Sequence, residues 1–299
     1  MSKLLVCDPI ADSAVKAMRD AGIDVDVRDD ITLDALAEII GDYEGMVVRS
    51  RTKVREPLIE KATKMKVIIR GGAGLDSIDV TFAQSKGIDV RNTPAANSNA
   101  VAELVIGMMI GLARHIANAD ASMKAGSWDK KKLKGTEISG KTLGVIGYGR
   151  IGQLVGGKAK ALGMTVMGYD PYIEHADIVP LDDLLRAADY VTLHVPMTPE
   201  TAGFIGADAF AKMKPGARLI QASRGGTVDE AALSKALADG VVSAAALDVY
   251  TEEPPQGDLL KSLVALPNVI ATPHIGAASA EATARVGGEI VKIAISYLT

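Results

Sequence analysis

The stretch TLGVIGYGRIG, residues 142–152, joins a short apolar run to three glycines spaced G-x-G-x-x-G. A helix-forming segment follows, so the glycines lie between a predicted strand and a predicted helix. In such a turn Gly147 permits the sharp bend, Gly149 lets a pyrophosphate approach the backbone, and Gly152 lets the helix pack closely on the strand. The free N–H groups at the start of the helix would then bind phosphates. The stretch therefore predicts a dinucleotide-binding α/β unit.

A carboxylate ends the next predicted strand. The segment MTVMGYD ends at Asp170, which lies 23 residues after Gly147. An acid about 20 residues after the first glycine binds the ribose hydroxyls of the adenosine half in this kind of unit. It would also repel a 2′-phosphate, and the neighbouring Pro171 and Tyr172 supply no cation. We therefore expect NAD as the cofactor rather than NADP.

Apolar strands alternate with helical stretches on both sides of the glycine turn. Four strand-like runs precede it, KLLVC, GMVVRS, KVIIR and IDVRN, and six belong to its own half, TLGVIG, MTVMGYD, YVTLHV, ARLIQAS, SAAALDV and NVIATPH. Continuous apolar strands that alternate with helices indicate parallel sheets covered on both faces. We predict an α/β protein of two doubly wound parallel-sheet domains, with a cleft between them.

Two longer helices are expected, one over residues 98–123 and one over residues 279–298. Inside the helix that follows the glycine turn stand Gly156 and Gly157. Each would destabilise a helix by about 1 kcal/mol relative to alanine, and nothing in the sequence explains them.

The composition is that of an ordinary globular protein. The 299 residues suffice for two domains, and the formal net charge of −4 gives no general attraction to nucleic acid or to an anionic membrane. The lysine-rich run DKKKLKG, residues 129–135, has no interleaved aromatic residues and is predicted to be a solvated loop. We expect no nucleic-acid partner.

The most apolar segment, residues 101–116, is only 16 residues long and carries Glu103 and Arg114. It is predicted to be a buried or interface helix rather than a membrane span. The sequence begins without a signal-like apolar run, and its single cysteine, Cys7, fits a reducing compartment. We therefore expect a cytoplasmic protein.

Polar side chains end several predicted strands, where open α/β sheets bind their ligands. They are Arg49, Arg70, Asp170, His194, Arg224, Asp248 and His274. Hydride transfer to or from a carbon that bears oxygen needs an acid or base near the operating pH, which favours histidine. His115 falls on a predicted helix and His175 in a loop, whereas His194 and His274 both end strands. Spacing alone does not choose between these two.

Seven stretches of the sequence match, in order, those of a known family. They are RSRTKV (49–54), RGGAGLDSIDV (70–80), NTPAANSNAVAE (92–103), LGVIGYGRIG (143–152), ASRGGTVDEAAL (222–233), AALDVYTEEPP (245–255) and TPHIGAAS (272–279). On these motifs the sequence resembles the NAD-dependent D-2-hydroxyacid dehydrogenases, and within that family the D-3-phosphoglycerate dehydrogenases. The resemblance implies a flavodoxin-like substrate domain over residues 1–95 and 275–299. It also implies a Rossmann NAD-binding domain over residues 96–274 and a homodimer to which the long helix contributes.

The resemblance implies three catalytic residues. Arg224, in ASRGG, would hold the substrate carboxylate and polarise the C2 oxygen. His274, which follows TP, would take the hydroxyl proton as hydride leaves C2 for the nicotinamide. Glu253, directly before a proline, would orient His274 and stabilise its protonated form. The resemblance thus selects His274 over His194.

The same matching implies the remaining ligand contacts. For NAD they are Gly147, Gly149 and Gly152 of the turn, Arg150 and Ile151 at the pyrophosphate, Asp170 on the ribose, Val195 near the adenosine, and Ala222 and Asp248 near the nicotinamide. For the substrate they are backbone N–H groups around Gly72, Ala73, Gly74 and Leu75, and the side chains of Arg49 and Arg51 for a phosphate. No metal is expected.

The implied reaction is oxidation of D-3-phosphoglycerate to 3-phosphohydroxypyruvate, which opens the route to serine. Arg49 and Arg51 favour a phosphorylated acid, although for each a surface position or an ion pair with a nearby acid is the competing interpretation. The segments GGAGLDSID and QASRGG depart from the family's more usual AGTGVDNVD and NCARGG, so an enzyme of glyoxylate, hydroxypyruvate or another D-2-hydroxyacid stays open. A binding protein that senses NAD, like the corepressors of similar fold, is the alternative of another class. The sequence ends at Thr299 without the C-terminal regulatory domain of many phosphoglycerate dehydrogenases, so serine feedback through such a domain is not expected.

Overall fold

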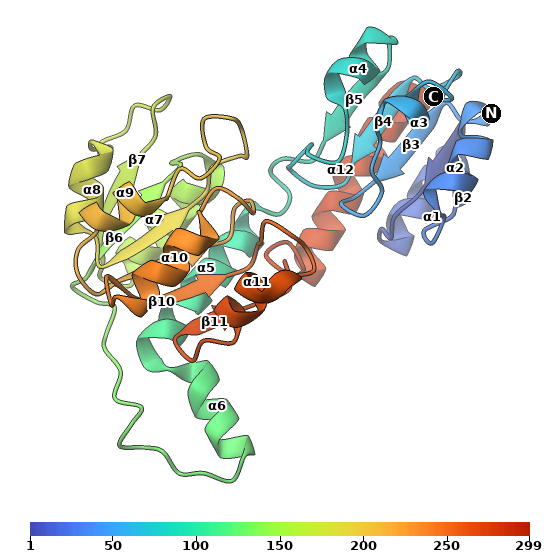
Figure 1. Ribbon diagram of the computed structural model, residues 1–299. Helices are drawn as coiled ribbons and strands as arrows, with labels where there is room; N and C mark the ends of the chain where they lie inside the picture. The colour runs from blue at the N-terminus through green and yellow to red at the C-terminus, as the bar shows by residue number, and fades with distance from the viewer. The chain divides into compact units, whose positions relative to one another are not determined.

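Two parallel sheets organise the protein in the computed structural model, which describes residues 1–299 (Figure 1). One sheet lies in unit 1, Met1–Ser98 with Ala277–Thr299, and the other in unit 2, Asn99–Gly276. Helices cover both faces of each sheet, because the central strands are apolar on both sides. The predicted fold class, two parallel-sheet α/β domains, is confirmed, whereas the cleft between them stays a prediction.

The sheet of unit 1 has five parallel strands in the order β2-β1-β3-β4-β5. Their bounds are β1 Lys3–Val6, β2 Asp24–Val27, β3 Gly45–Val48, β4 Val67–Arg70 and β5 Asp89–Asn92. The sequence pattern missed β2, because its residues DVDV alternate an acid with valine on an edge strand and form no apolar run. The carboxyl ends of β1, β3 and β4 are neighbours, and the candidate substrate residues follow β3 and β4.

The helices of unit 1 form two layers, one on each face of its sheet. On one face lie α2 (Leu33–Ile39), α3 (Glu56–Ile59) and α4 (Val80–Ser85), with the short 3-10 helix η1 (Ile40–Asp42) after α2. On the other lie α1 (Asp12–Asp20) and α12 (Ala280–Leu298). The Ser279 hydroxyl caps α12 by accepting from the amide of Ala282 at 3.1 Å. The C-terminal helix thus completes the core of the unit in which the chain begins.

The sheet of unit 2 has six parallel strands in the order β11-β10-β9-β8-β6-β7. Their bounds are β6 Thr142–Ile146, β7 Thr165–Tyr169, β8 Tyr190–Leu193, β9 Ala217–Gln221, β10 Val242–Leu247 and β11 Val269–Ala271. The chain runs outward from β6 to β7 and then returns to the other side of β6 as β8. This reversal is the topological switch point at which doubly wound sheets bind ligands, and the glycine turn follows β6 directly.

Seven helices belong to unit 2, and they again form two layers. On one face are α8 (Leu181–Ala187), α9 (Ala207–Lys212), α10 (Glu230–Ala238) and α11 (Gly257–Val264). On the other are α5 (Ser98–Arg114) and α7 (Arg150–Ala161), and α6 (Ile116–Lys124) follows α5.

The prediction of one continuous helix over residues 98–123 is wrong, and His115 lies at the break rather than within a helix. His115 takes the left-handed conformation, with φ 54°, and α5 and α6 are bent by 66°. The carbonyl of Ala113 accepts from the amide of Thr136 at 2.9 Å and so serves a later segment of the chain, not a continuing helix. No individual helix is long and apolar enough to cross a bilayer, and only α5 and α6 together, despite their bend, reach the length and composition of a span.

Candidate active site

The glycine turn after β6 is tight on one side and open on the other. Gly147 has φ +88°, and a Cβ there would lie 2.7 Å from the backbone carbonyl of His194. A Cβ on Gly152 would lie 2.2 Å from the carbonyl oxygen of Gly147, so only glycine lets α7 pack this close to the strand. Gly149 caps α7, and a Cβ there would meet nothing within 4 Å. The open space over Gly149 lies beside the amides of Arg150 and Ile151, where a phosphate would be bound.

Asp170 follows β7 and is held by two backbone amides. Its Oδ2 accepts from the N–H of Tyr148 at 2.9 Å, and its Oδ1 accepts from the N–H of Tyr172 at 3.0 Å. A carboxylate offers about four acceptor positions, so it keeps capacity for two ribose hydroxyls. The turn, the start of α7 and this acid therefore fit the pyrophosphate and the adenosine ribose of a dinucleotide.

Arg224 stands on a turn that begins where β9 ends. The buried side chain of Gln221 fastens this turn: its Nε2 donates to the Arg224 carbonyl at 3.0 Å and to the Thr227 hydroxyl at 2.6 Å, and its Oε1 accepts from the Ser223 hydroxyl at 2.9 Å. The Thr227 hydroxyl also lies 2.9 Å from the Arg224 carbonyl. Sequence reasoning missed Gln221 and Thr227, although a glutamine at the end of a buried apolar strand was a usable signal.

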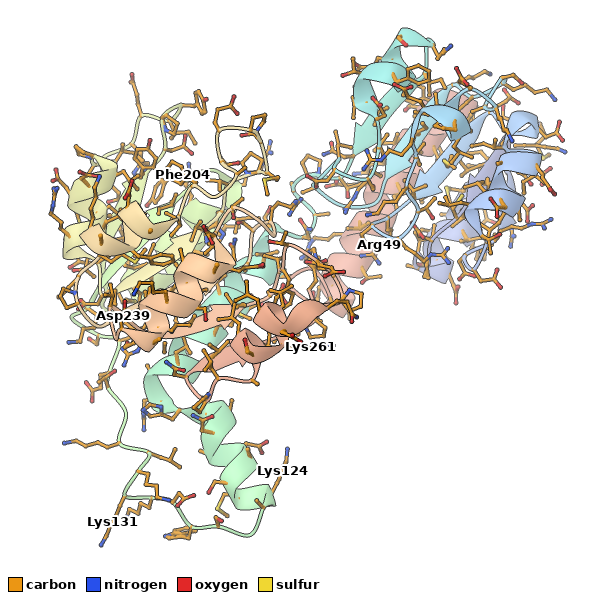
Figure 2. The ribbon with its side chains drawn as sticks, viewed as in Figure 1. Arg49, Lys124, Lys131, Phe204, Asp239 and Lys261 are labelled. Carbon is orange, nitrogen blue, oxygen red and sulfur yellow. The ribbon has the colours of Figure 1, made fainter.

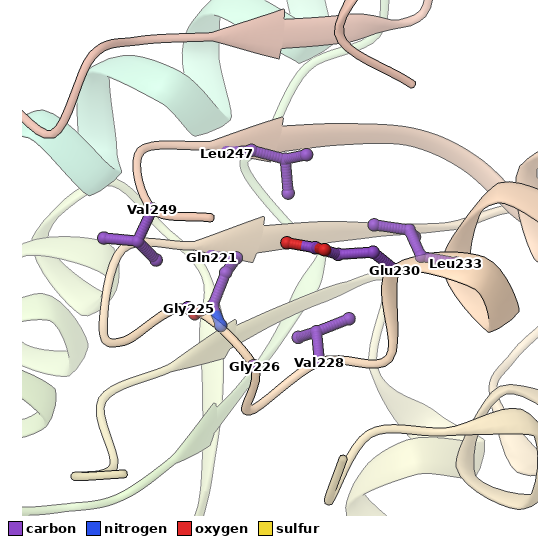
Figure 3. Close-up of a pocket in the computed structure, with 8 residues that line it drawn as sticks. All are labelled: Gln221, Gly225, Gly226, Val228, Glu230, Leu233, Leu247 and Val249. Atoms are coloured by element: carbon purple, nitrogen blue, oxygen red, sulfur yellow. The ribbon is translucent and has the colours of Figure 1, made fainter. Parts of the chain in front are cut away.

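Gly225 is required by a neighbouring loop. A Cβ there would lie 1.8 Å from the carbonyl oxygen of Tyr250, so the turn after β9 presses directly on the loop after β10. Gly225 also lines a cavity of about 10 Å³, which Figure 3 shows with Gln221, Gly226 and five further residues around it. That volume holds one water molecule at most. The cavity is thus an internal packing gap and not a substrate site.

His274 and Glu253 form the one close pair of a histidine and a carboxylate among the strand-end candidates. The Nδ1 of His274 lies 2.8 Å from Oε2 of Glu253, and the side chains are 43% and 36% exposed. The other oxygen of Glu253 accepts from the Tyr250 amide at 3.2 Å, which fixes the carboxylate. His274 adopts a left-handed backbone with φ 53°, unusual for a residue with a Cβ. A strained backbone that presents a carboxylate-bound, solvent-reachable imidazole is a geometry suited to proton transfer.

Asp248 holds the segment that carries His274. It is 1% exposed, and its Oδ1 accepts from the Thr272 hydroxyl at 2.6 Å and the Ile275 amide at 2.8 Å. Its Oδ2 accepts from the Gly276 amide at 2.8 Å. The Tyr250 hydroxyl, 3.1 Å from the Thr272 carbonyl, supports the same segment, and burial raises the pKa of Tyr250 to about 12. Asp248 therefore positions the His274 backbone in addition to any contact it makes with a nicotinamide.

His194, the other strand-end histidine, is placed differently. Its Nε2 lies 3.1 Å from the Thr192 hydroxyl, and its Nδ1 is buried with no hydrogen-bond partner. Burial lowers the pKa of His194 to about 3, so the ring is neutral near pH 7. Its backbone lies against Gly147, and Val195 beside it borders the same glycine.

Unit 1 carries the candidate phosphate residues on the loop after β3. The buried carboxylate of Asp8, after β1, accepts from the Arg49 amide at 2.5 Å, from Nε of Arg51 at 2.9 Å and from the Thr52 hydroxyl at 2.9 Å. Burial disfavours the charged form of Asp8, yet these hydrogen bonds hold its pKa below the usual value. Arg51 also donates from Nη2 to the Cys7 carbonyl. The guanidinium of Arg49, labelled in Figure 2, makes no hydrogen bond or ion pair in this structure.

The loop after β4 contains the candidate residues for the substrate carboxylate. Gly72 has φ +144°, and its N–H donates to the Arg70 carbonyl at 2.9 Å. The carbonyl of Ala73 accepts from the Asn92 side chain at 2.6 Å, which anchors the loop to the end of β5. Because the Gly72 amide is engaged, the amides of Ala73, Gly74 and Leu75 are the donors that remain for a carboxylate.

The structure groups the predicted residues by unit. In unit 2, Arg224, Glu253 and His274 follow β9, β10 and β11, which are adjacent in the sheet. In unit 1, Arg49 lies beside the loop after β4, since a Cβ on Gly71 would be 3.5 Å from its side chain. Asp8 was missed, although a carboxylate directly after an apolar strand resembles the strand-end pattern noted elsewhere.

Known proteins of one family are similar to this chain over most of its length. Residues 106–276 match the family model described as D-isomer specific 2-hydroxyacid dehydrogenase, NAD binding domain. The chain is 49% identical over 295 residues to D-3-phosphoglycerate dehydrogenase of Methanocaldococcus jannaschii, covering 96% of this chain and 56% of that protein. It is 49% identical over 263 residues to hydroxypyruvate reductase of Thermotoga maritima, covering 87% of this chain and 86% of that protein.

A solved structure is similar over nearly the whole chain. The NAD⁺-bound 3-phosphoglycerate dehydrogenase of Entamoeba histolytica superposes with a TM-score of 0.84 at 31% identity, covering 99% of this chain and 95% of that one. The chain spans about half the length of the curated phosphoglycerate dehydrogenases that it matches.

Proposed function

The chain belongs to the family of D-isomer specific 2-hydroxyacid dehydrogenases, and we propose that it oxidises D-3-phosphoglycerate to 3-phosphohydroxypyruvate. The observation that carries the chemistry is the pair of His274 and Glu253 at 2.8 Å, on the same sheet edge as Arg224. The choice of substrate is supported by the relatives of that name and by the uncommitted guanidinium of Arg49. A product of this kind would feed the synthesis of serine.

The residues of the candidate site have separate roles in the reaction. NAD, when bound at the glycine turn, supplies the acceptor for the hydride that leaves C2. With the proton of its neutral ring on Nδ1 and bonded to Glu253, His274 has Nε2 available to take the proton of the C2 hydroxyl. Glu253 stabilises the imidazolium that results. Arg224 would bind the substrate carboxylate through two parallel hydrogen bonds from its planar guanidinium. The hydrogen bond from the Gln221 side chain to the Arg224 carbonyl fixes the backbone of Arg224.

Arg49 is the better candidate for the substrate phosphate. The guanidinium of Arg51 is tied to Asp8 and to the Cys7 carbonyl, so much of its charge is already balanced. The guanidinium of Arg49 has no such partner, whereas the backbone of Arg49 is held by its amide on Asp8 and by its carbonyl, which accepts from the Ser77 hydroxyl. We therefore assign the phosphate to Arg49 and give Arg51 the task of shaping the loop.

The test is NADH formation with 3-phosphoglycerate, glycerate and D-lactate, in the wild type and in matched Arg49→Ala and Arg51→Ala variants. We expect kcat/KM to be highest for 3-phosphoglycerate. Arg49→Ala should lower it by about 100-fold for that acid, because a charge-assisted contact is lost, and leave glycerate nearly unchanged. Arg51→Ala should affect all three acids alike. Equal kcat/KM for phosphorylated and unphosphorylated acids would contradict the phosphate assignment.

Two other functions are distinguished by this assay together with the reverse reaction, in which NADH is consumed. Reduction of hydroxypyruvate is the second candidate, because the hydroxypyruvate reductase of Thermotoga maritima matches this chain along most of its own length. Faster NADH consumption with hydroxypyruvate than with 3-phosphohydroxypyruvate would favour it. NADH binding without turnover of any acid would instead indicate a binding protein that senses NAD.

We also propose a homodimer in the cytoplasm. Ile116 and Met123 on α6 are 52% and 57% exposed, and Trp128, between the residues labelled Lys124 and Lys131 in Figure 2, is 78% exposed. Clustered large apolar side chains on one segment are typical of an interface. Sedimentation of a Trp128→Glu variant tests the dimer. The single thiol, Cys7, is buried and suits a reducing compartment.

A further inference from the structure

The side chain of Tyr148 fills a slot that two glycines open for it. Tyr148 is the second residue of the glycine turn and is 2% exposed. A Cβ on Gly168 of β7 would lie 2.6 Å from its ring, and a Cβ on Gly156 of α7 would lie 2.9 Å from its hydroxyl. Gly156, which the sequence left unexplained, is therefore needed for this ring. The ring is thus held in one position by α7 and β7 together.

The Tyr148 hydroxyl ends on a charged pair. It donates to Oδ2 of Asp177 at 2.5 Å, and Nζ of Lys160, on α7, lies 2.8 and 2.7 Å from the two oxygens of the same carboxylate. The Asp177 side chain is only 14% exposed. Burial disfavours its charged form, yet the hydrogen bonds from Lys160 and Tyr148 hold the pKa of Asp177 below its usual value. The hydroxyl thus has an ionised and fixed partner.

Asp177 also fixes the segment that follows Asp170. Its carbonyl accepts from the Gly168 amide at 2.8 Å, and the Val179 amide donates to the Gly168 carbonyl at 2.9 Å. The segment 171–179 is thereby paired with the strand that ends at Asp170. The amide of Tyr148 donates to Asp170 at 2.9 Å, so one residue connects the pair of Asp177 and Lys160 to the carboxylate of Asp170.

We propose that Tyr148, Asp177 and Lys160 form a positioning network for the adenosine half of NAD. By fixing the Tyr148 ring, the network fixes the Tyr148 amide, and through that amide it holds Asp170 in place to receive the ribose hydroxyls. All three act through Asp170 and are positioning residues. The inference rests on the binding of NAD by this unit and not on the choice of hydroxy acid.

The test is a Tyr148→Phe variant, which keeps the ring in its slot and removes only the hydroxyl. NADH is titrated by fluorescence without any hydroxy acid, and ADP-ribose and nicotinamide mononucleotide are titrated as competitors. We expect Kd to rise about tenfold for NADH and for ADP-ribose, the scale of one lost hydrogen bond to a charged group, with no change for nicotinamide mononucleotide.

Tyr190→Phe is the matched control. Tyr190 is fully buried in the same unit, and its hydroxyl accepts from Nη1 of Arg218 at 2.7 Å, but it starts β8 and so lies at the opposite end of the strands from Asp170. The Tyr190→Phe substitution should lower the thermal midpoint of unfolding about as much as Tyr148→Phe does, and it should leave all three Kd values unchanged. An equal loss of NADH affinity in both variants, or none in Tyr148→Phe, overturns the proposal.

A second variant decides the question if Tyr148→Phe does not fold. Asp177→Asn leaves the tyrosine in place and removes the charge, so it should weaken NADH and ADP-ribose binding and spare nicotinamide mononucleotide. Unchanged affinities in a folded Asp177→Asn protein also overturn the proposal. Because no titration contains a hydroxy acid, these outcomes do not depend on whether 3-phosphoglycerate is turned over.

Discussion

His194 follows β8 and His274 follows β11, at the same edge of the same six-stranded sheet. The ring of His194 has a buried Nδ1 without a partner and only the Thr192 hydroxyl at 3.1 Å. The ring of His274 is 43% exposed and lies 2.8 Å from the Glu253 carboxylate. One imidazole is confined to its neutral form, and the other has a partner for the charged form and access to solvent.

This difference identifies what makes a strand-end histidine useful for proton transfer. The position at the end of a parallel strand places a side chain near a ligand, but both histidines have that position. Exchange of a proton also needs a counter-charge for the protonated ring and a route to the substrate or to water. Only the segment after β11, held by Asp248 and faced by Glu253, supplies these.

The largest effect is expected from His274→Asn. The amide is close in size but cannot take a proton, so kcat should fall by about 10²–10⁴-fold. NADH affinity should be retained, because the glycine turn and Asp170 are untouched. Steady-state NADH formation and a fluorescence titration measure the two quantities. Retained turnover would show that the roles of the two histidines have been assigned in the wrong order.

Glu253→Gln should have the next largest effect. The amide oxygen still accepts from Nδ1 of His274 but no longer neutralises the imidazolium, so kcat should fall by about 10- to 100-fold. The neighbouring Glu252→Gln is the matched control, since Glu252 is an exposed acid one residue away, and it should keep kcat. Similar losses in both variants would mean that general negative charge, and not the contact with His274, supports turnover.

Asp248→Asn tests whether the backbone of the His274 segment must be held. An amide nitrogen would face either the Thr272 hydroxyl and Ile275 amide or the Gly276 amide, so one buried donor is left unpaired. Unfolding in urea should show a loss of about 2 kcal/mol, and kcat should fall with it. Asp239→Asn, at the exposed position labelled in Figure 2, breaks only a surface pair with Lys235 and should change stability by less than about 0.5 kcal/mol. No difference between the two variants would contradict the holding role.

Local patterns predicted much of the fold. The glycine turn and the buried strands of both sheets each depend on residues that are close together in the sequence, such as Gly147, Gly149 and Gly152 of the turn. They could therefore be predicted without a structure. The break of the long helix could not be predicted in this way, because it involves a hydrogen bond from the amide of Thr136, far along the chain, to the carbonyl of Ala113. Strand β2 escaped because an edge strand needs no apolar run.

The candidate site was predicted less completely from the residues themselves. Strand-end position gave both histidines, and only the family resemblance chose His274. The physical reason for that choice, the contact with Glu253 across 21 positions of sequence, exists only in the folded chain. The same is true of Asp8 and Arg51, which are 43 positions apart, and of the slot in which Gly156 receives Tyr148.

The smallest effect on turnover is expected from His194→Gln, which tests the neutral member of the pair through stability. Burial lowers the pKa of His194 to about 3, whereas the unfolded chain binds a proton near pH 6.5. Between these values the unfolded state holds the extra proton, so His194 should make the wild type less stable as pH falls from 6.5 towards 3, by up to about 1.4 kcal/mol per pH unit. The variant should lose this part of the slope in urea unfolding measured at several pH values, while kcat stays within about threefold.

Thr192→Val is the control for that slope. It removes the hydroxyl that contacts His194 but leaves the ring buried and neutral, so the pH dependence of stability should persist although the protein is less stable overall. If His194→Gln keeps the wild-type slope, the ring exchanges protons in the folded state, and the contrast with His274 then rests on Glu253 alone. If His194→Gln loses the slope and keeps its turnover, burial gives His194 a structural role. The carboxylate beside His274 then accounts for the role of His274 in proton transfer.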